Sequence, residues 1–183
     1  MDYKELITLI KQRRSIRSFK NKNVERWQIE RLIEAAIWAP SGSNAQAWHF
    51  VAIDDPYNLR RLSAFLPGVW KTPPTMICLC IDCELEYIRA GKLGVETLGI
   101  MDIAMAAQNI MLMAEVLHLG SCVIKGFNSD VLKIALSLPD HIKPELLMVI
   151  GYPLKPAKAP SRKPLNQILH WQQYQQKNEA PND

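Results

Sequence analysis

The chain has 183 residues, of which 48% are hydrophobic and 22% are charged, with 8 glycines, 12 prolines and a net charge of +4. This balance is typical of one globular domain and excludes collagen, coiled-coil and disordered proteins. The longest apolar runs, 76–81 and 146–150, are far shorter than the roughly 20 residues of a membrane-spanning helix, and the polar start is unlike a secretory signal. We therefore expect one cytoplasmic domain over residues 1–174 and a disordered tail at 175–183.

In the first half of the chain, apolar residues recur at helical spacing over 3–13 and over 25–39, where Pro40 ends the second helix. Residues 48–54 favour a strand, 59–65 a short helix, and 76–83 a second strand. Alternation along that strand places Cys78 and Cys80 on one face and Cys83 on the other. The cysteines are therefore expected to be reduced and structural, and no metal site is predicted.

In the second half, a long helix is predicted over 85–117, with an interruption near 91–94. From 98 to 117 it is apolar nearly all round, so it needs cover on most sides, which a subunit interface would provide. A short strand at 122–124, a helix at 130–138 capped by Asn128 or Ser129, and a strand at 145–152 follow. The proline-rich, basic segment 153–164 is expected to be extended. This irregular order favours an α+β sandwich over a doubly wound parallel sheet.

Basic residues are concentrated near the N-terminus, where only Glu25 opposes them: Lys11, Arg13, Arg14, Arg17, Lys20, Lys22 and Arg26. The cluster indicates anion binding. A small phosphate ligand fits it better than nucleic acid, because the chain has no zinc-finger or RNP motif and no basic stretch interleaved with aromatic residues. The glycines form no dinucleotide or phosphate-loop motif, and the four histidines are scattered without metal-ligand spacing.

Three segments carry residue types suited to a phosphorylated heterocycle. Residues 13–17 (Arg-Arg-Ser-Ile-Arg) offer forked guanidinium donors and a hydroxyl, although a solvated helix end would look the same. Residues 39–48 combine small residues with the amides of Asn44 and Gln46, which can pair with the edge of a flavin ring, although a plain turn would serve equally. Residues 119–127 end a predicted strand at which backbone N–H groups could point outward.

Together and in this order, the three segments resemble the nitroreductase family of FMN-dependent enzymes. The resemblance extends to about Ile168 and includes Asp102 in the long helix and the late Ser161–Pro164 segment. It implies a nitroreductase-like α+β sandwich with a mixed, mainly antiparallel sheet flanked by helices. It also implies a central helix that forms a homodimer, with FMN at the subunit interface and each site drawing on both chains.

The resemblance also assigns site residues. Phosphate and ribityl contacts would come from Arg13, Arg14, Ser15, Arg17 and Arg162, and the partner chain would supply Pro40, Ser41, Ser43, Asn44 and Gln46. The main chain of Lys125 and Gly126 would lie near flavin N5, and no side chain is obligatory as a catalytic acid. Lys125 is a cation where relatives often carry a neutral or acidic residue, so it either alters the flavin potential or points to solvent. Lys71 and Trp70 are candidate pocket residues, and Trp70 fits the core equally well.

The activity expected from the resemblance is hydride transfer from NADH or NADPH to nitroaromatic compounds, quinones or similar electron-poor acceptors. Two alternatives remain. One is a flavin-binding or storage protein with the same pocket and no significant turnover, and the other is a basic module that binds nucleic acid. The oxidoreductase hypothesis, which we favour, implies a small aromatic or quinone substrate and no nucleic-acid or membrane partner.

Overall fold

The computed structural model describes residues 2–67, 69 and 71–175. The helices are α1 (Tyr3–Gln12), α2 (Arg26–Ala36), α3 (Pro56–Ser63), α4 (Cys83–Leu93), α5 (Gly99–Val116), α6 (Ser129–Ala135) and α7 (Leu165–Ile168). The strands are β1 (Trp48–Ile53), β2 (Thr75–Asp82), β3 (Gly120–Ile124) and β4 (Ile142–Gly151). Each predicted helix and strand is confirmed, with ends shifted by a few residues. Trp70 and, apart from Gln175, the predicted tail lie outside the described residues.

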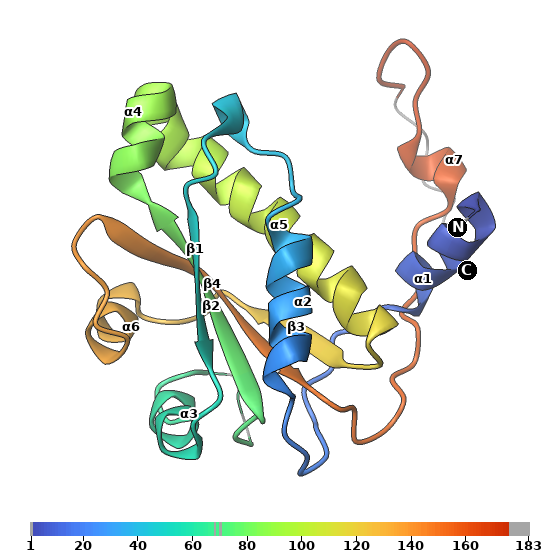
Figure 1. Cartoon of the computed structure of the whole chain (residues 1–183). Helices are drawn as coiled ribbons and strands as arrows, with labels where there is room; N and C mark the ends of the chain where they lie inside the picture. The colour runs from blue at the N-terminus through green and yellow to red at the C-terminus, as the bar shows by residue number, and fades with distance from the viewer. Residues whose placement is uncertain (1, 68, 70, 176–183) are drawn as a thin grey trace.

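The four strands form one sheet in the order β1-β2-β4-β3, and every strand pair is antiparallel. The only parallel pairing among the described residues is an isolated bridge between Ser15 and Ser121. Helices α2 and α5 cover one face of the sheet, and α3 and α6 cover the other (Figure 1). The predicted α+β sandwich is therefore confirmed.

Strand β2 is apolar from Met76 to Ile81, as is typical of a strand with both faces covered. Ile77 and Leu79 belong to the core beneath α2 and α5, whereas Met76, Cys78 and Cys80 belong to the core beneath α3 and α6. The two thiols therefore lie on one face, as predicted, with their sulfur atoms 3.6 Å apart.

The helical run from Cys83 to Val116 is irregular at its centre, as expected. Gly91 has a φ of +61°, and a π-helical turn, Gly94–Leu98, joins α4 to α5. The run is long and apolar enough to cross a membrane by length and composition alone. In this fold, the face of the run that points to the sheet belongs to the hydrophobic core, because Ile103, Ala106 and Ile110 are buried there.

The basic N-terminal segment that follows α1 runs along the outer edge of β3. The Ile16 N–H donates to the Ser121 carbonyl at 2.9 Å, and the Lys20 N–H donates to the Tyr152 carbonyl at 2.8 Å. Gly120 permits this approach, since a Cβ there would lie 2.7 Å from the Ile16 side chain. Helix α1 buries no residue, and together with α7 it extends away from the sandwich (Figure 1).

Candidate functional site

A cavity of about 220 Å³ opens where the basic edge segment meets the end of β3. Its described lining includes three cations, Arg17, Lys71 and Lys125, and no carboxylate. The remaining lining is mostly apolar and includes Phe19, Val69, Pro73 and Cys122, with Gly126 at the end of β3. This combination suits a flat, partly apolar ligand that carries negative charge.

A second cavity of about 300 Å³ adjoins the first and shares Arg17, Phe19, Lys71 and Pro73 with it. It adds the cations Lys20 and Arg60 and one carboxylate, Asp54. That carboxylate is already paired with Arg26, whose Nε lies 3.0 Å from Asp54 Oδ2. The two cavities therefore form one cationic region at the edge of the sheet.

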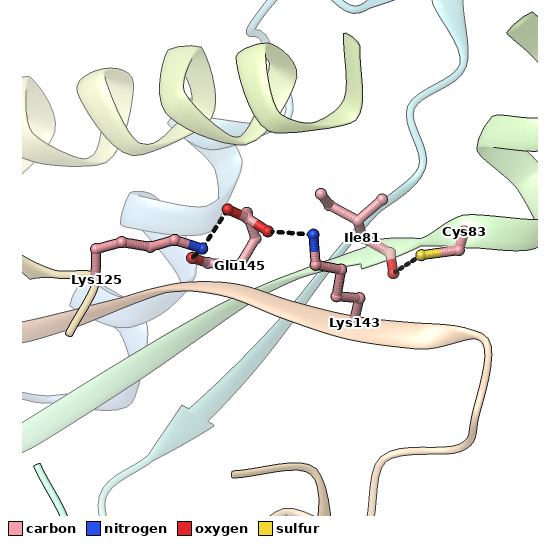
Figure 2. A network of polar contacts seen from close by, with 5 residues as sticks. All are labelled: Ile81, Cys83, Lys125, Lys143 and Glu145. Atoms are coloured by element: carbon pink, nitrogen blue, oxygen red, sulfur yellow. Dashed lines mark hydrogen bonds and ion pairs between the residues drawn. The ribbon is translucent and has the colours of Figure 1, made fainter. Parts of the chain in front are cut away.

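The Lys125 side chain is held by Glu145 of β4 (Figure 2). The Lys125 ammonium donates to the Glu145 carbonyl at 2.9 Å and also to Glu145 Oε1, and Lys143 approaches the other carboxylate oxygen at 2.9 Å. Burial alone would raise the pKa of Glu145, but the two lysine ammoniums outweigh it and hold the pKa below its usual range. The Lys125 ammonium is thus paired with Glu145, although the side chain itself is 60% exposed.

The arginines of the N-terminal segment do not all reach this cavity. Arg17 lines it, whereas Arg14 lines a separate cavity of about 530 Å³ together with Lys155. The buried Nε of Arg14 has no hydrogen-bond partner among the described residues. Arg13 lies against α5, with a nitrogen 3.9 Å from the Met111 sulfur, and Ser15 is exposed beside β3.

The loop that contains Pro40, Ser41, Ser43, Asn44 and Gln46 lies beside the N-terminal part of α5 (Figure 1), and none of these residues lines the 220 Å³ cavity. Ser43, Asn44 and Gln46 all have positive φ, near +50°, an uncommon conformation that clusters at functional sites.

Two buried carboxyl groups lie on α4 and α5, and the one on α5 supports that loop. Both carboxylate oxygens of Asp102 lie 3.1 Å from the Gly42 backbone nitrogen, which donates to them. Burial raises the pKa of Asp102 although this bond opposes the shift. Burial, followed by the charges of Asp102 and Asp82, raises the pKa of Glu86 as well, and Glu86 Oε2 has no partner among the described residues.

Arg162 lies on the exposed C-terminal segment. It donates to its neighbour, the Ser161 carbonyl, at 3.1 Å, and no ion pair joins it to another described residue. Within one chain, the predicted site residues are therefore dispersed. Arg17, Lys125 and Gly126 line the 220 Å³ cavity and Arg14 lines a separate one, whereas Arg13 lies against α5, Ser15 beside β3, the loop 40–46 beside the start of α5, and Arg162 on the C-terminal segment.

Sequence reasoning did not single out Phe19, Cys122 or Glu145. Phe19 and Cys122 read as ordinary core residues, and nothing local distinguishes them. Glu145 gives a weak signal, because it is an acid within an otherwise apolar strand beside Lys143. A carboxylate buried in such a strand needs a cationic partner. Lys125 is a cation of the predicted site whose side chain had no assigned role, so it could have been considered as that partner.

Comparisons with known proteins converge on one family. A family model described as Nitroreductase family matches residues 10–76 and 65–152. The FMN reductase (NADPH) of Bacillus subtilis is 28% identical over 184 residues, which cover 92% of this chain and 74% of that protein. The solved NADPH:FMN oxidoreductase of Vibrio harveyi, in complex with NAD+, has a TM-score of 0.82 at 26% identity, covering 94% and 79% of the two chains. An FMN-dependent nitroreductase of Clostridium difficile has a TM-score of 0.79 at 27% identity, covering 92% and 99%.

Proposed function

As a member of the nitroreductase family, this chain is an NAD(P)H-dependent flavin oxidoreductase, and we propose that it uses FMN to reduce nitroaromatic compounds, quinones or similarly electron-poor acceptors in two-electron, ping-pong steps. The observation that carries the proposal is the cationic, largely apolar cavity at the end of β3. The similar proteins support FMN as the cofactor, because the names of several of them include FMN.

Two observations of this structure fit FMN. A Cβ built on Gly126 would have nothing within 4 Å, so the cavity wall is open where the main chain of Lys125 and Gly126 is proposed to face the flavin. Arg14 lines the separate cavity of about 530 Å³, where its buried Nε has no partner among the described residues, and a phosphate or ribityl oxygen would supply one.

The side chains of this protein have binding and orienting roles in the proposed reaction. Arg17 and Lys71 would stabilise negative charge on the reduced ring, and Phe19 and Val69 would exclude water from one side of it. Bound FMN would supply the redox chemistry, accepting hydride from the nicotinamide and passing it to the acceptor. No protein acid or base is required for that transfer.

Arg13, Arg14, Ser15 and Arg162 are proposed to bind the phosphate and ribityl end. Guanidinium groups suit this end because they can bind phosphate oxygens through two parallel hydrogen bonds. Arg162 is free to move toward the others, since it lies on an exposed segment that extends from the sandwich (Figure 1).

A homodimer with shared sites explains why the loop 40–46 lies away from the cavity of its own chain. The outer face of α5 supports this proposal, because Met101 is 53% exposed and Ile100 and Val116 are also exposed. Trp38, just before the loop, is 81% exposed. A second copy packed on α5 would cover these apolar groups and bring its loop toward the cavity.

The experiment that tests the function is anaerobic stopped-flow mixing of the purified, FMN-loaded protein with NADH or NADPH. Rapid loss of the oxidised-flavin absorbance, followed by its recovery on adding a quinone or nitroaromatic acceptor, is the expected result. Flavin that stays oxidised with both nicotinamides would instead identify a storage protein. A protein that takes up no FMN would contradict both functions.

A further inference from the structure

Glu145 is the extra residue of a β-bulge in the centre of the sheet. In the pairing of β2 with β4, Leu79 lies opposite Leu146 and the next residue, Cys80, lies opposite Pro144, so Glu145 has no partner on β2. The pairing of β3 with β4 ends at Ile124 and Leu147, before Glu145 is reached. Bulges redirect side chains and are frequent beside active sites.

The bulge directs a buried carboxylate at two lysines. Glu145 is 3% exposed, and Lys125 and Lys143 reach its carboxylate from opposite sides (Figure 2). The carboxylate is buried, whereas the side chains of Lys125 and Lys143 are 60% and 42% exposed. A buried carboxylate held by such lysines is weak evidence for a stabilising role, since an apolar residue of similar size often gives equal or greater stability. We therefore consider what else the arrangement holds in place.

A candidate reason lies in Lys125 and Gly126, which line the proposed FMN cavity immediately after the β3–β4 ladder ends, and in Phe127, which follows them. Gly126 has no side chain to anchor the segment, and even a Cβ built there would have nothing within 4 Å. The residues on either side hold the segment instead. The Lys125 ammonium is bound to Glu145 and lies 5.7 Å from the centre of the Phe127 ring, and the Phe127 N–H donates to the Lys125 carbonyl at 2.9 Å.

We propose that Glu145 is a positioning residue, which fixes the main chain of Lys125 and Gly126 at the wall of the cavity and keeps the Lys125 ammonium out of it. The part that concerns the cavity rests on the proposed flavin function. Arg17 and Lys71 then remain the cations that act on the ligand, and Lys125 contributes its backbone while its charge is balanced by Glu145.

The first test does not depend on flavin. The purified protein is treated with an amine-acetylating reagent, and the rate at which Lys125 is modified is followed by peptide mass spectrometry. In Glu145→Gln, Lys125 should react about tenfold faster than in the wild type, the factor expected for the loss of one charge-assisted contact. Lys143→Met is the matched control, because it removes the other lysine and leaves the Lys125–Glu145 contact, so its Lys125 should react at nearly the wild-type rate.

An unchanged Lys125 rate in Glu145→Gln would overturn the proposal, as would an equal increase in Lys143→Met. If the Gln variant does not fold, Glu145→Met repeats the measurement with an apolar side chain of similar length. Absence of FMN binding by the wild-type protein would contradict the proposed function alone, because the labelling result still decides whether Glu145 holds Lys125.

The second test measures the midpoint potential of bound FMN. In Glu145→Gln the released Lys125 ammonium should reach the cavity and stabilise the reduced, anionic flavin, so the potential should shift to more positive values. The shift should disappear in the double variant Lys125→Met/Glu145→Gln, which has no ammonium to release. A wild-type midpoint potential in the single variant would overturn the role of Glu145 in the cavity, as would a shift that persists in the double variant. A purely structural role of Glu145 would not make the potential return to the wild-type value when Lys125 is also replaced.

Discussion

At the scale of single residues, Gly126 offers the sharpest test of where FMN binds. A Cβ at this position meets nothing within 4 Å and the backbone φ is not positive, so Gly126→Ala should change the stability of the protein without FMN by no more than about 0.5 kcal/mol. The added methyl group would occupy space proposed for the flavin. FMN affinity, measured by quenching of flavin fluorescence, should therefore fall.

The matched control for Gly126→Ala is Gly91→Ala. Gly91 also has open space around its Cβ, but its φ is +61°, a conformation that costs alanine about 1 kcal/mol. This variant should lose stability and keep its FMN affinity. If Gly126→Ala binds FMN as tightly as the wild type, the cavity at the end of β3 is not the flavin site.

Glu86 leads to a prediction about pH. Burial, then the charges of Asp102 and Asp82, raise its pKa above the usual 4.5, so the folded state binds this proton more tightly than the unfolded state does. The stabilising contribution is therefore complete below pH 4.5 and is lost as the pH rises through the higher pKa of the folded state. At pH 7 the buried charge destabilises the protein.

Glu86→Gln should consequently raise the melting temperature at pH 7 and change it little near pH 4, where the native side chain is protonated. Glu84→Gln, on the exposed side of the same helix, should have little effect at either pH. A melting temperature that falls at pH 7 would mean that the charged form of Glu86 is stabilising, contrary to this account.

At the scale of elements, the sequence predicts those features that local periodicity and breakers determine. The helical spacing before Pro40 and the β-rich run 76–83 indicated α2 and β2 within a few residues, and Gly91 indicated the interruption of the long helix. The bulge at Glu145 could not be predicted, because it depends on the register between two strands that are about 60 residues apart. The Lys125–Glu145 contact was hidden for the same reason.

The loop beside α5 gives a prediction at this scale. Asp102 is the acceptor for the Gly42 N–H at the start of a loop with three residues of positive φ. Asp102→Ala would leave that N–H without its partner, which should cost about 1–3 kcal/mol of stability in urea denaturation. It should also weaken FMN binding, since the loop is proposed to contact the flavin.

Asp102→Asn is the matched control, because its amide oxygen can still accept from Gly42. It should retain most of the stability and FMN affinity that the alanine variant loses. Equal losses in both variants would show that the carboxylate acts in some way other than as an acceptor for the loop.

At the scale of the whole molecule, one chain does not bring all of the predicted site residues together. The sequence supplied the residues, and the family resemblance supplied their roles, but neither places Arg162 or the loop 40–46 next to Arg17. One chain also leaves apolar side chains exposed along α1 and α5, among them Tyr3 and Met101. In the proposed dimer the second copy would cover them, and local sequence patterns carry no information about its orientation.

Met101→Glu follows from this arrangement. A charge on the outer face of α5 would be buried without a partner in the proposed dimer, so the variant should shift toward monomer in analytical ultracentrifugation. FMN binding should fall in parallel, because each site needs both chains. Ile134→Glu is the control, since Ile134 is also exposed, at 81% against 53% for Met101, but lies on α6, on the opposite face of the sheet.

The most direct test of the central claim is native mass spectrometry of the purified protein loaded with FMN. The account predicts one dominant species that contains two chains and two FMN molecules, with the cofactor and the second chain lost together on activation. A monomer that retains one FMN, or a dimer that binds none, would contradict a flavin site shared between two subunits.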